Sequence, residues 1–475
     1  MSISADVLRS YRSIDEKTVD ELLAQEIKNN NKKIVVLDDD PTGVQTVHDI
    51  SVYTGWDADS LREAFAEENN LFYILTNSRG FTEEQTKEAH LEIADAVDRA
   101  AKEASRDYIF ISRSDSTLRG HYPLETRLLK ECYERNTGVK LDGEILCPFF
   151  KEGGRYTIGN VHYVKYGDEL VPAHETEFAK DKTFGYTAEN LPDYVEEKTA
   201  GEYKAKDVIS ISLEDIRSMD FDKIKSQLMS AKNFNKIIVN AIDYSDIKVF
   251  AAALFRAMNA GKMFMFRTAA ALVKVMGGVS DMPLLTRSDM IVNETENGGI
   301  IVVGSHTAKT TSQLECLKEI ADIEFIELDA NLVRDEEGFA NEVDRCLALE
   351  GEYIESGKTV CCYTSRSLVV ANTGDKEDEL RLSVRISDAV QSLVGRLPVT
   401  PSFVVAKGGI TSSDVGVKAL KVKRATVLGQ IKPGIPVWQT GSESKFPDTP
   451  YVIFPGNVGE ATTLREAVEE LMNKR

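Results

Sequence analysis

Residues 32–43 are KKIVVLDDDPTG, so an aliphatic run ends abruptly at three aspartates, a proline and a glycine. A short apolar run that stops at turn-forming residues is typical of a buried β-strand. The same pattern recurs at 71–80, 107–116 and 143–150. A helix-like stretch at 83–104 separates two of these runs. Strands that alternate with helices predict a parallel α/β sheet.

The rest of the chain continues this alternation. Further strand-like runs lie at 206–213, 235–244, 261–268 and 298–303. Residues 281–299 mix Pro, Asn and Gly without sustained periodicity, which is typical of a linker. We therefore predict two α/β domains, residues 1–285 and 286–475, each with a largely parallel sheet flanked by helices. Residues 4–30 predict a helix attached to the first domain.

The bulk composition agrees with this division and excludes some functions. A chain of 475 residues exceeds what one hydrophobic core usually organises. Its net charge of -20 disfavours nucleic acid and anionic membranes as partners. The sequence predicts neither a signal peptide nor a membrane span, and its six scattered cysteines form no CxxC pair. We expect a cytoplasmic protein with reduced thiols.

Polar residues that directly follow strands are the first candidates for a site, because ligands bind at the carboxyl ends of parallel strands. Asp38, Asp39 and Asp40 crowd three carboxylates onto one turn, where like charges raise pKa values. For Asp38 alone, a helix-capping role is an equal alternative. The complete string DDDPTG favours a functional site.

The segment SRSDSTLRGHYP at 112–123 is a second candidate. Arg113 and Arg119 supply two guanidinium groups that suit bidentate binding of a carboxylate, and Asp115 supplies a base between them. A purely structural Arg–Asp pair is the alternative. Asn77, Arg79 and Arg267 also follow strand-like runs, and we expect them to contribute substrate contacts.

Glycines mark the strand ends of the second domain. They form three turns, Gly304 with Ser305, Gly408–Gly409 with Thr411, and Gly456 with Asn457 and Gly459. Glycine lets backbone N–H groups approach phosphate oxygens, so these turns predict anion binding. The segment GSHTAKT is not a P-loop, because Ala308 stands where that motif has glycine, and no GxGxxG follows a strand.

The order of the motifs resembles the four-carbon acid sugar kinase family over nearly the whole chain. The motifs are DDDPTG (38–43), TNSRG (76–80), SDSTLRG (114–120), GSHTAKTTSQ (304–313), AKGGITSSD (406–414), GQIKPGIPVW (429–438) and FPGNVG (454–459). The resemblance implies an N-terminal domain that binds a sugar acid and a C-terminal domain that binds ATP. It also implies transfer of the γ-phosphoryl group to a tetronate-type substrate.

The resemblance assigns residues to both ligands. It implies that Asp39, Asp40, Asp115 and Arg119 face the sugar acid. It implies ATP contacts by Ser305, Gly408, Gly409, Ile410, Thr411, Gly456, Asn457 and Gly459. The sequence departs from the family where DDDPTGVQTVHD replaces a simpler DD-x-TGA and where SRSDST replaces a lysine-containing segment. These departures leave the identity of the substrate open.

The expected reaction uses ATP and Mg²⁺ to phosphorylate a hydroxyl of threonate, erythronate or a 3-oxo-tetronate. Asp115 or Asp40 would accept the hydroxyl proton, and Arg119 and Arg113 would bind the carboxylate. The ligands of the metal are unassigned. Two alternatives are an NAD-dependent hydroxy-acid dehydrogenase and a non-catalytic sensor of sugar acid and nucleotide. The expected partner is a small sugar acid, and a homodimer is compatible with the sequence.

Overall fold

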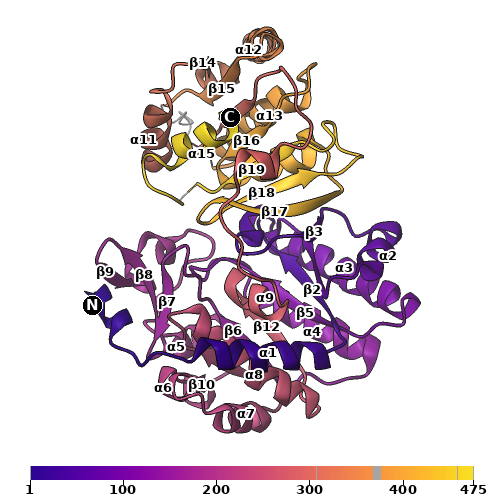
Figure 1. Ribbon diagram of the computed structural model, residues 1–475, viewed down its shortest axis with the longest axis vertical. Helices are drawn as coiled ribbons and strands as arrows, with labels where there is room; N and C mark the ends of the chain where they lie inside the picture. Colours follow the sequence, from indigo (N-terminus) through magenta and orange to yellow (C-terminus); the bar gives the residue numbers. More distant parts are fainter. Residues whose placement is uncertain (1, 306, 367–375, 457, 474–475) are drawn as a thin grey trace. The chain divides into compact units, whose positions relative to one another are not determined.

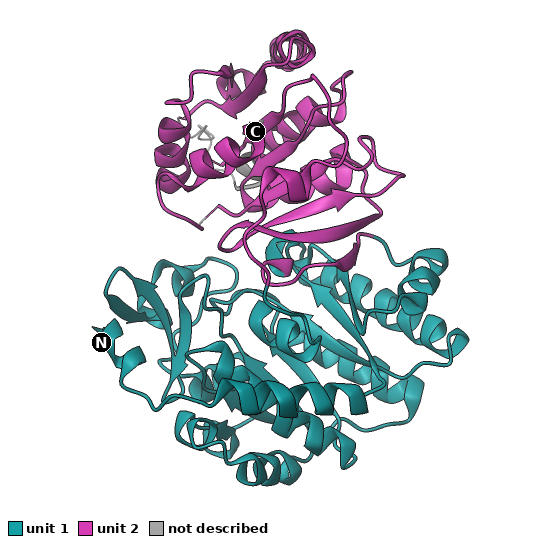
Figure 2. Cartoon of the chain, in the orientation of Figure 1, with its two compact units in different colours: residues 1–43, 55–281 teal, residues 44–54, 282–475 magenta. Residues whose placement is uncertain are grey.

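The computed structural model describes residues 2–305, 307–366, 376–456 and 458–473. The chain forms two compact units (Figure 2). Unit 1 comprises residues 1–43 and 55–281, and unit 2 comprises residues 44–54 and 282–475. The short segment 44–54, which the sequence analysis assigned to the first domain, therefore belongs to unit 2.

Unit 1 is built on a parallel sheet whose strands are mostly buried on both faces (Figure 1). In spatial order the strands are β10 (Ile209–Ile211), β11 (Asn235–Val239), β6 (Gly143–Cys147), β12 (Phe264–Thr268), β5 (Tyr108–Arg113), β2 (Lys33–Asp38) and β4 (Leu71–Leu75). Every residue of β2, β4, β5, β6 and β12 is buried. The aliphatic runs of the sequence are therefore the centre of this core.

Helices flank this sheet. They are α1 (Glu16–Asn29), α2 (Ala58–Ala66), α3 (Glu83–Glu103), α4 (Leu124–Thr137), α5 (Leu191–Lys198), α6 (Leu213–Arg217), α7 (Phe221–Ser230), α8 (Tyr244–Asn259) and α9 (Ala270–Met276). Helix α8 is almost entirely buried, and α1 and α7 pack against it. Ion pairs of Lys248 with Asp20 and of Arg256 with Glu26 join α1 to α8 at 2.7 and 2.8 Å.

A small antiparallel sheet completes unit 1. Its order is β1 (Ile3–Ser4), β9 (Glu169–Pro172), β8 (Val161–Tyr166) and β7 (Arg155–Ile158). The single helix predicted at 4–30 is therefore wrong. Strand β1 pairs with β9, a 3₁₀ turn follows, and α1 starts only after Asp15, whose side chain accepts a hydrogen bond from the Thr18 N–H.

Unit 2 has a mixed sheet. In spatial order its strands are β3 (Ile50–Tyr53), β17 (Arg424–Lys432), β18 (Ile435–Thr440), β19 (Pro450–Phe454), β16 (Val404–Lys407), β13 (Ile300–Val303), β15 (Thr359–Thr364) and β14 (Ile323–Leu328). The strands from β19 to β14 are parallel, and those from β3 to β19 are antiparallel. Strand β3 explains why segment 44–54 belongs here, because it pairs with β17.

The helices of unit 2 are α10 (Arg287–Met290), α11 (Ala308–Leu317), α12 (Glu336–Glu355), α13 (Lys376–Gly395), α14 (Gly409–Asp414) and α15 (Thr463–Met472). Buried aliphatic residues of β13, β16 and β19 form its core together with α15. The predicted class, α/β with two domains of largely parallel sheet, is thus confirmed.

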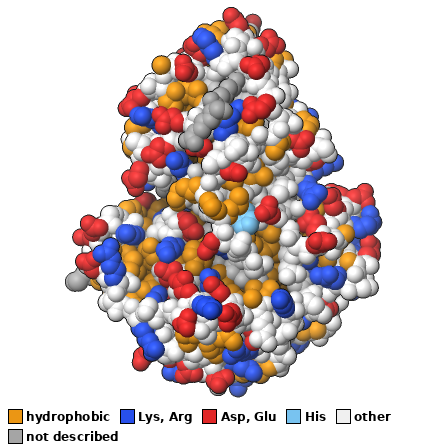
Figure 3. Space-filling model, viewed as in Figure 1, with side chains coloured by type: hydrophobic (Ala, Val, Ile, Leu, Met, Phe, Trp, Pro, Cys, Tyr) orange, Lys and Arg blue, Asp and Glu red, His pale blue; other side chains and the backbone are white. Residues whose placement is uncertain are grey.

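Acidic and basic side chains are interspersed over the face drawn in Figure 3. Within the described residues, no helix has the length and apolar character that crossing a membrane requires.

Candidate functional site

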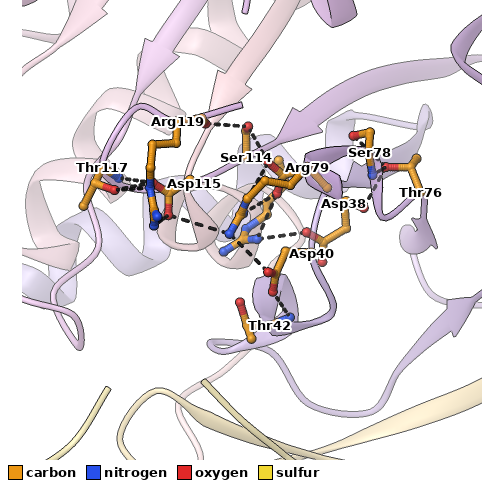
Figure 4. A network of polar contacts seen from close by, with 12 residues as sticks. Asp38, Asp40, Thr42, Thr76, Ser78, Arg79, Ser114, Asp115, Thr117 and Arg119 are labelled. Atoms are coloured by element: carbon orange, nitrogen blue, oxygen red, sulfur yellow. Dashed lines mark hydrogen bonds and ion pairs between the residues drawn. The ribbon is translucent and has the colours of Figure 1, made fainter. Parts of the chain in front are cut away.

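Four neighbouring strands of unit 1 end in one row. The strand register places Leu75 of β4, Asp38 of β2, Arg113 of β5 and Thr268 of β12 side by side. The loops that follow the first three strands therefore leave the sheet at one edge. They bring Asp38–Asp40, Thr76–Arg79 and Ser114–Gly120 together in a single polar network (Figure 4).

Asp38 and Arg113 form the buried base of this network. The Arg113 Nη1 atom lies 2.9 Å from the Asp38 Oδ1 atom, and the two side chains are only 4% and 1% exposed. Burial raises the pKa of Asp38 to about 7, although the Arg113 guanidinium acts in the opposite direction. Gly43 leaves room for this carboxylate, because a Cβ atom there would lie 2.0 Å from both Asp38 oxygens.

Arg79 joins the two following aspartates. Its Nη2 and Nε atoms donate to the two carboxylate oxygens of Asp39 at 2.5 and 3.1 Å, and its Nη1 atom donates to Asp40 at 3.1 Å. Burial alone would raise the pKa of Asp40. The Arg79 guanidinium and hydrogen bonds from Thr42 outweigh burial and hold that pKa below its usual value.

Arg119 and Asp115 form a second bidentate pair. The Arg119 Nε and Nη2 atoms donate to the two Asp115 oxygens at 2.9 and 3.2 Å. The backbone N–H and hydroxyl of Thr117 donate to the same carboxylate. Burial is outweighed by Arg119 and Arg79, which hold the pKa of Asp115 well below its usual range. Asp115 is therefore ionised at any ordinary pH.

Hydrogen bonds from buried side chains to backbone carbonyls fix the loop that carries Asp115 and Arg119. The Arg267 Nη2 atom donates to the Arg119 carbonyl at 2.8 Å. The Tyr194 hydroxyl donates to the Leu118 carbonyl at 2.9 Å, and a ring nitrogen of His162 lies 2.7 Å from the Ser116 carbonyl oxygen. Leu118 has a positive φ of 72° that such contacts stabilise.

The predicted substrate residues thus fall into two groups. Arg79, Arg119, Asp40 and Asp115 keep 11 to 22% of their side-chain surface exposed. Asp39, Arg113 and Arg267 are nearly fully buried, so they support the network from within. Asn77 is partly buried in a left-handed turn with φ of 56°, and its Oδ1 atom has no hydrogen-bond donor among the described residues.

The glycine turns of unit 2 also lie in one row. The register places Tyr363 of β15, Val303 of β13, Lys407 of β16 and Phe454 of β19 side by side. The turns beginning at Gly304, Gly408 and Pro455 therefore leave the same edge of the sheet. Of the predicted nucleotide contacts, Asn457 lies outside the described residues.

Two of these turns touch each other. A Cβ atom on Gly304 would lie 2.3 Å from the Thr411 Oγ1 atom, and one on Gly408 would lie 3.3 Å from the Ser305 Cβ atom. Gly408 also has a φ of 124°, which side chains rarely adopt. Ser305 and Thr411 are thus brought together, while Ile410 next to them is 73% exposed.

Helix α11 holds the third turn. The Gln313 Nε2 atom donates to the carbonyls of Val458 and Glu460 at 3.1 and 2.9 Å, and the Lys309 Nζ atom donates to the Gly459 carbonyl at 3.2 Å. Gly459 has a φ of 82°. The three predicted turns therefore form one connected surface.

Comparison with known protein families covers both units. Residues 34–276 match a sugar-binding N-terminal domain, and residues 300–464 match a nucleotide-binding C-terminal domain. The chain belongs to the four-carbon acid sugar kinase family. The predicted resemblance is therefore confirmed. The sugar-binding match covers most of unit 1 and includes residues 44–54 of unit 2, and the nucleotide-binding match lies within unit 2.

Solved structures share the fold of this family member at low sequence identity. A Haemophilus influenzae protein is 18% identical, with a TM-score of 0.59 over 92% of this chain and 100% of that one. A Salmonella typhimurium LT2 protein, provisionally described as a tRNA synthase, is 14% identical, with a TM-score of 0.62 over 92% and 99%. Among curated proteins, no sequence matches this chain.

Three cations near the turns of the nucleotide-binding domain, Lys407, Lys309 and Arg366, were not predicted as site residues from the sequence. Lys407 is fully buried, and its Nζ atom donates to the Pro455 carbonyl at 2.6 Å. Burial lowers its pKa to about 7, and the nearby Lys309 ammonium adds to this shift. The Arg366 Nη2 atom donates to the Ser305 carbonyl at 2.7 Å. Lys407 directly precedes the Gly408–Gly409 pair, and this position could have identified it as a candidate from the sequence.

The aspartates of the sugar-binding domain do not fit a metal centre built by the protein alone. Each of Asp38, Asp39, Asp40 and Asp115 pairs with a guanidinium group, which repels a cation at the same oxygen atoms. Across the described residues, no three His, Cys, Asp or Glu side chains are arranged to hold a metal ion.

Proposed function

We propose that this family member is an ATP-dependent kinase that phosphorylates a hydroxyl of a four-carbon acid sugar of the threonate, erythronate or 3-oxo-tetronate type. One observation carries the proposal. A network of carboxylates and guanidinium groups lies at strand ends of the sugar-binding domain, and clustered glycine turns with cations lie at strand ends of the nucleotide-binding domain.

The sugar acid is assigned to the exposed side of the unit 1 network. Arg119 and Arg79 are its most accessible guanidinium groups, at 22 and 20% side-chain exposure, and they suit a carboxylate ligand. Arg113, Arg267 and Asp39 position these groups from within.

Asp40 is the better candidate for the base that accepts the hydroxyl proton. The Asp115 Oδ2 atom already accepts from the Thr117 N–H, the Thr117 hydroxyl and the Arg119 Nε atom. Asp40 accepts fewer hydrogen bonds, from Thr42 and from Arg79. A carboxylate with fewer donors keeps lone pairs for a substrate hydroxyl. Asp115 then positions Arg119.

The nucleotide phosphates are assigned to the turns of unit 2. Ser305, Thr411 and the N–H groups of Gly409, Gly456 and Gly459 would donate to phosphate oxygens, and Lys309, Lys407 and Arg366 would balance their charge. The exposed Ile410 offers an apolar contact. Mg²⁺ would arrive with ATP as part of this substrate, held by phosphate oxygens.

A panel assay tests the proposed activity. Wild-type protein is incubated with ATP, MgCl₂ and single stereoisomers of threonate, erythronate and 3-oxo-tetronates, and ADP release is recorded. We expect one or a few acids to stimulate ADP release well above the rate with ATP alone. If the acids bind but none stimulates ADP release, the kinase proposal fails and a sensor of sugar acid and nucleotide becomes the better account.

A further inference from the structure

Arg155 is a partly buried cation outside the network described above. It is the first residue of β7, in the small antiparallel sheet of unit 1. Its guanidinium donates to the Gly153 carbonyl and lies over the Phe178 ring, with its Cζ atom 5.4 Å from the ring centroid. Its Nε atom is buried and has no hydrogen-bond acceptor among the described residues.

Arg155 nevertheless belongs to the surroundings of Asp115 and Arg119. The Arg119 Cζ atom lies over the same Phe178 ring, 5.1 Å from its centroid. Burial lowers the pKa of Arg155, and the Asp115 carboxylate is the largest influence that opposes this shift. Phe178, in the turn Glu177–Lys180, thus carries one guanidinium from the network and one from β7.

Arg155 differs from the guanidinium groups of the network in its partners. Arg79, Arg113 and Arg119 form ion pairs with Asp38, Asp39, Asp40 and Asp115, and Arg267 donates to the Arg119 carbonyl. Arg155 adds a fifth guanidinium, and no ion pair with a carboxylate is found for it among the described residues.

Glu177 acts on Arg155 through space and raises the pKa of Arg155, but no ion pair joins the two side chains among the described residues. Glu177 accepts hydrogen bonds from the Tyr166 hydroxyl at 3.1 and 3.2 Å. A desolvated guanidinium without an anionic partner is costly unless a ligand completes its hydrogen bonds. An anion bound between Arg155 and Arg119 would supply these bonds.

We propose that Arg155 and Arg119, both stacked on Phe178, together bind the carboxylate group of the hydroxy-acid substrate, so that Arg155 determines specificity for acids over neutral polyols. This inference rests on the proposed function for the identity of the ligand. Two guanidinium groups on one aromatic ring present several N–H donors to one planar carboxylate. Phe178 keeps both groups in place.

The test measures ligand binding directly as well as turnover. Calorimetry compares each acid of the panel with its neutral amide, using wild-type protein, Arg155→Gln and Arg155→Lys. Arg62→Gln is the matched control, because Arg62 is exposed on α2 and outside the site. We expect Arg155→Gln to weaken binding of the acid about 10- to 100-fold, with the lysine variant in between and the control unchanged.

Binding of the neutral amide distinguishes a carboxylate-binding role of Arg155 from a purely structural one. Arg155→Gln should leave binding of the amide unchanged, whereas a merely structural role of Arg155 would weaken binding of both ligands. Equal acid affinity of wild type and Arg155→Gln, with acid-dependent ADP release intact, would overturn the inference and leave the kinase proposal standing. If binding of the acid depended on Arg155 but no ADP were released, the inference about Arg155 would stand and the kinase proposal would be overturned. No binding of any acid by wild-type protein would overturn both.

Discussion

Three aspartates within one network differ in chemistry because their neighbours differ. Asp38 is buried against Arg113. It retains a proton up to about pH 7, because the effect of burial on its pKa exceeds the opposing effect of the Arg113 charge. Asp40 and Asp115 are buried less completely and face Arg79 and Arg119, which hold their pKa values low. The network thus places a protonatable group at its base and permanent carboxylates at its exposed side.

The roles of Asp40 and Asp115 can be separated by kinetics. We expect Asp40→Asn to lower kcat by about 100-fold or more, because general-base assistance typically contributes this much. The KM for ATP should stay near the wild-type value. We expect Asp115→Asn to act mainly on the KM for the acid, because the loss of its charge releases Arg119. Steady-state kinetics with each variant, at saturating and limiting acid, provide the measurement.

The opposite pattern would reverse the assignment. If Asp115→Asn lowered kcat severely at unchanged KM while Asp40→Asn remained active, Asp115 would be the base. Circular dichroism of both variants serves as the folding control.

Some residue-level features were predictable from sequence and others were not. Asp115 and Arg119 stand four residues apart behind a strand, and their pairing was foreseen as an alternative. The predicted carboxylate-binding role of Arg113 finds no support, because Arg113 is the last residue of β5 and points into the buried base. Arg155 lies in a segment without periodicity, so only the fold brings it near Asp115.

At the scale of elements, the nucleotide site depends on how closely two turns approach. Gly304 follows β13 and Gly408 follows β16, and these strands are neighbours in register. The absence of a side chain at Gly304 lets the Thr411 hydroxyl fill that space. Gly304 is therefore required for packing against Thr411, and its lack of a side chain would also let a phosphate approach the backbone.

This packing predicts a coupled pair of substitutions. We expect Gly304→Ala to destabilise unit 2 by about 1–3 kcal/mol, because the new Cβ atom would overlap the Thr411 Oγ1 atom. Thr411→Ala removes that oxygen, so Gly304→Ala should cost less in the Thr411→Ala background. Chemical denaturation of the two single variants and the double variant measures the coupling. Additive effects would show that the two turns do not pack as described.

The order of elements was largely predictable, because long aliphatic runs bounded by turn residues leave few alternatives to buried parallel strands. The antiparallel sheet of β1, β9, β8 and β7 was missed. Its strands are short and only partly buried, so their alternation is weak. Strand β1 has only two residues, and its conformation comes from pairing with β9 rather than from its own sequence.

At the scale of the whole molecule, the chain changes unit at residues 43–44, 54–55 and 281–282. Sequence could indicate the last of these positions, because a linker-like segment begins there. It could not indicate the first two, because the pairing of β3 with β17 joins residues more than 370 positions apart. Such long-range pairings leave no local signal.

Asp38 in unit 1 and Lys407 in unit 2 are buried groups whose ionisation should affect stability. The folded state raises the pKa of Asp38 from 3.8 to about 7, so its contribution is complete below about pH 4 and is lost as the pH rises through 7. The folded state lowers the pKa of Lys407 from 10.5 to about 7, so stability is regained between about pH 7 and 10.5. Within each pH window, the free energy of unfolding should change by up to about 1.4 kcal/mol per pH unit.

Denaturant titrations across this pH range test both windows. We expect Asp38→Asn to flatten the slope between pH 4 and 7, and Lys407→Met to flatten the slope above pH 7. Trp438 is the tryptophan of unit 2, so its fluorescence in a Trp56→Phe background reports that unit. Unchanged slopes in either variant would show that the corresponding group does not carry the effect.

The most direct test of the kinase assignment is the mass of the acid recovered after incubation with wild-type protein, ATP and Mg²⁺. The account predicts that the stimulating acid gains one phosphoryl group and that phosphorylated acid and ADP form in equal amounts. Recovery of the acid unchanged, with inorganic phosphate formed in place of the phosphorylated acid, would contradict the assignment.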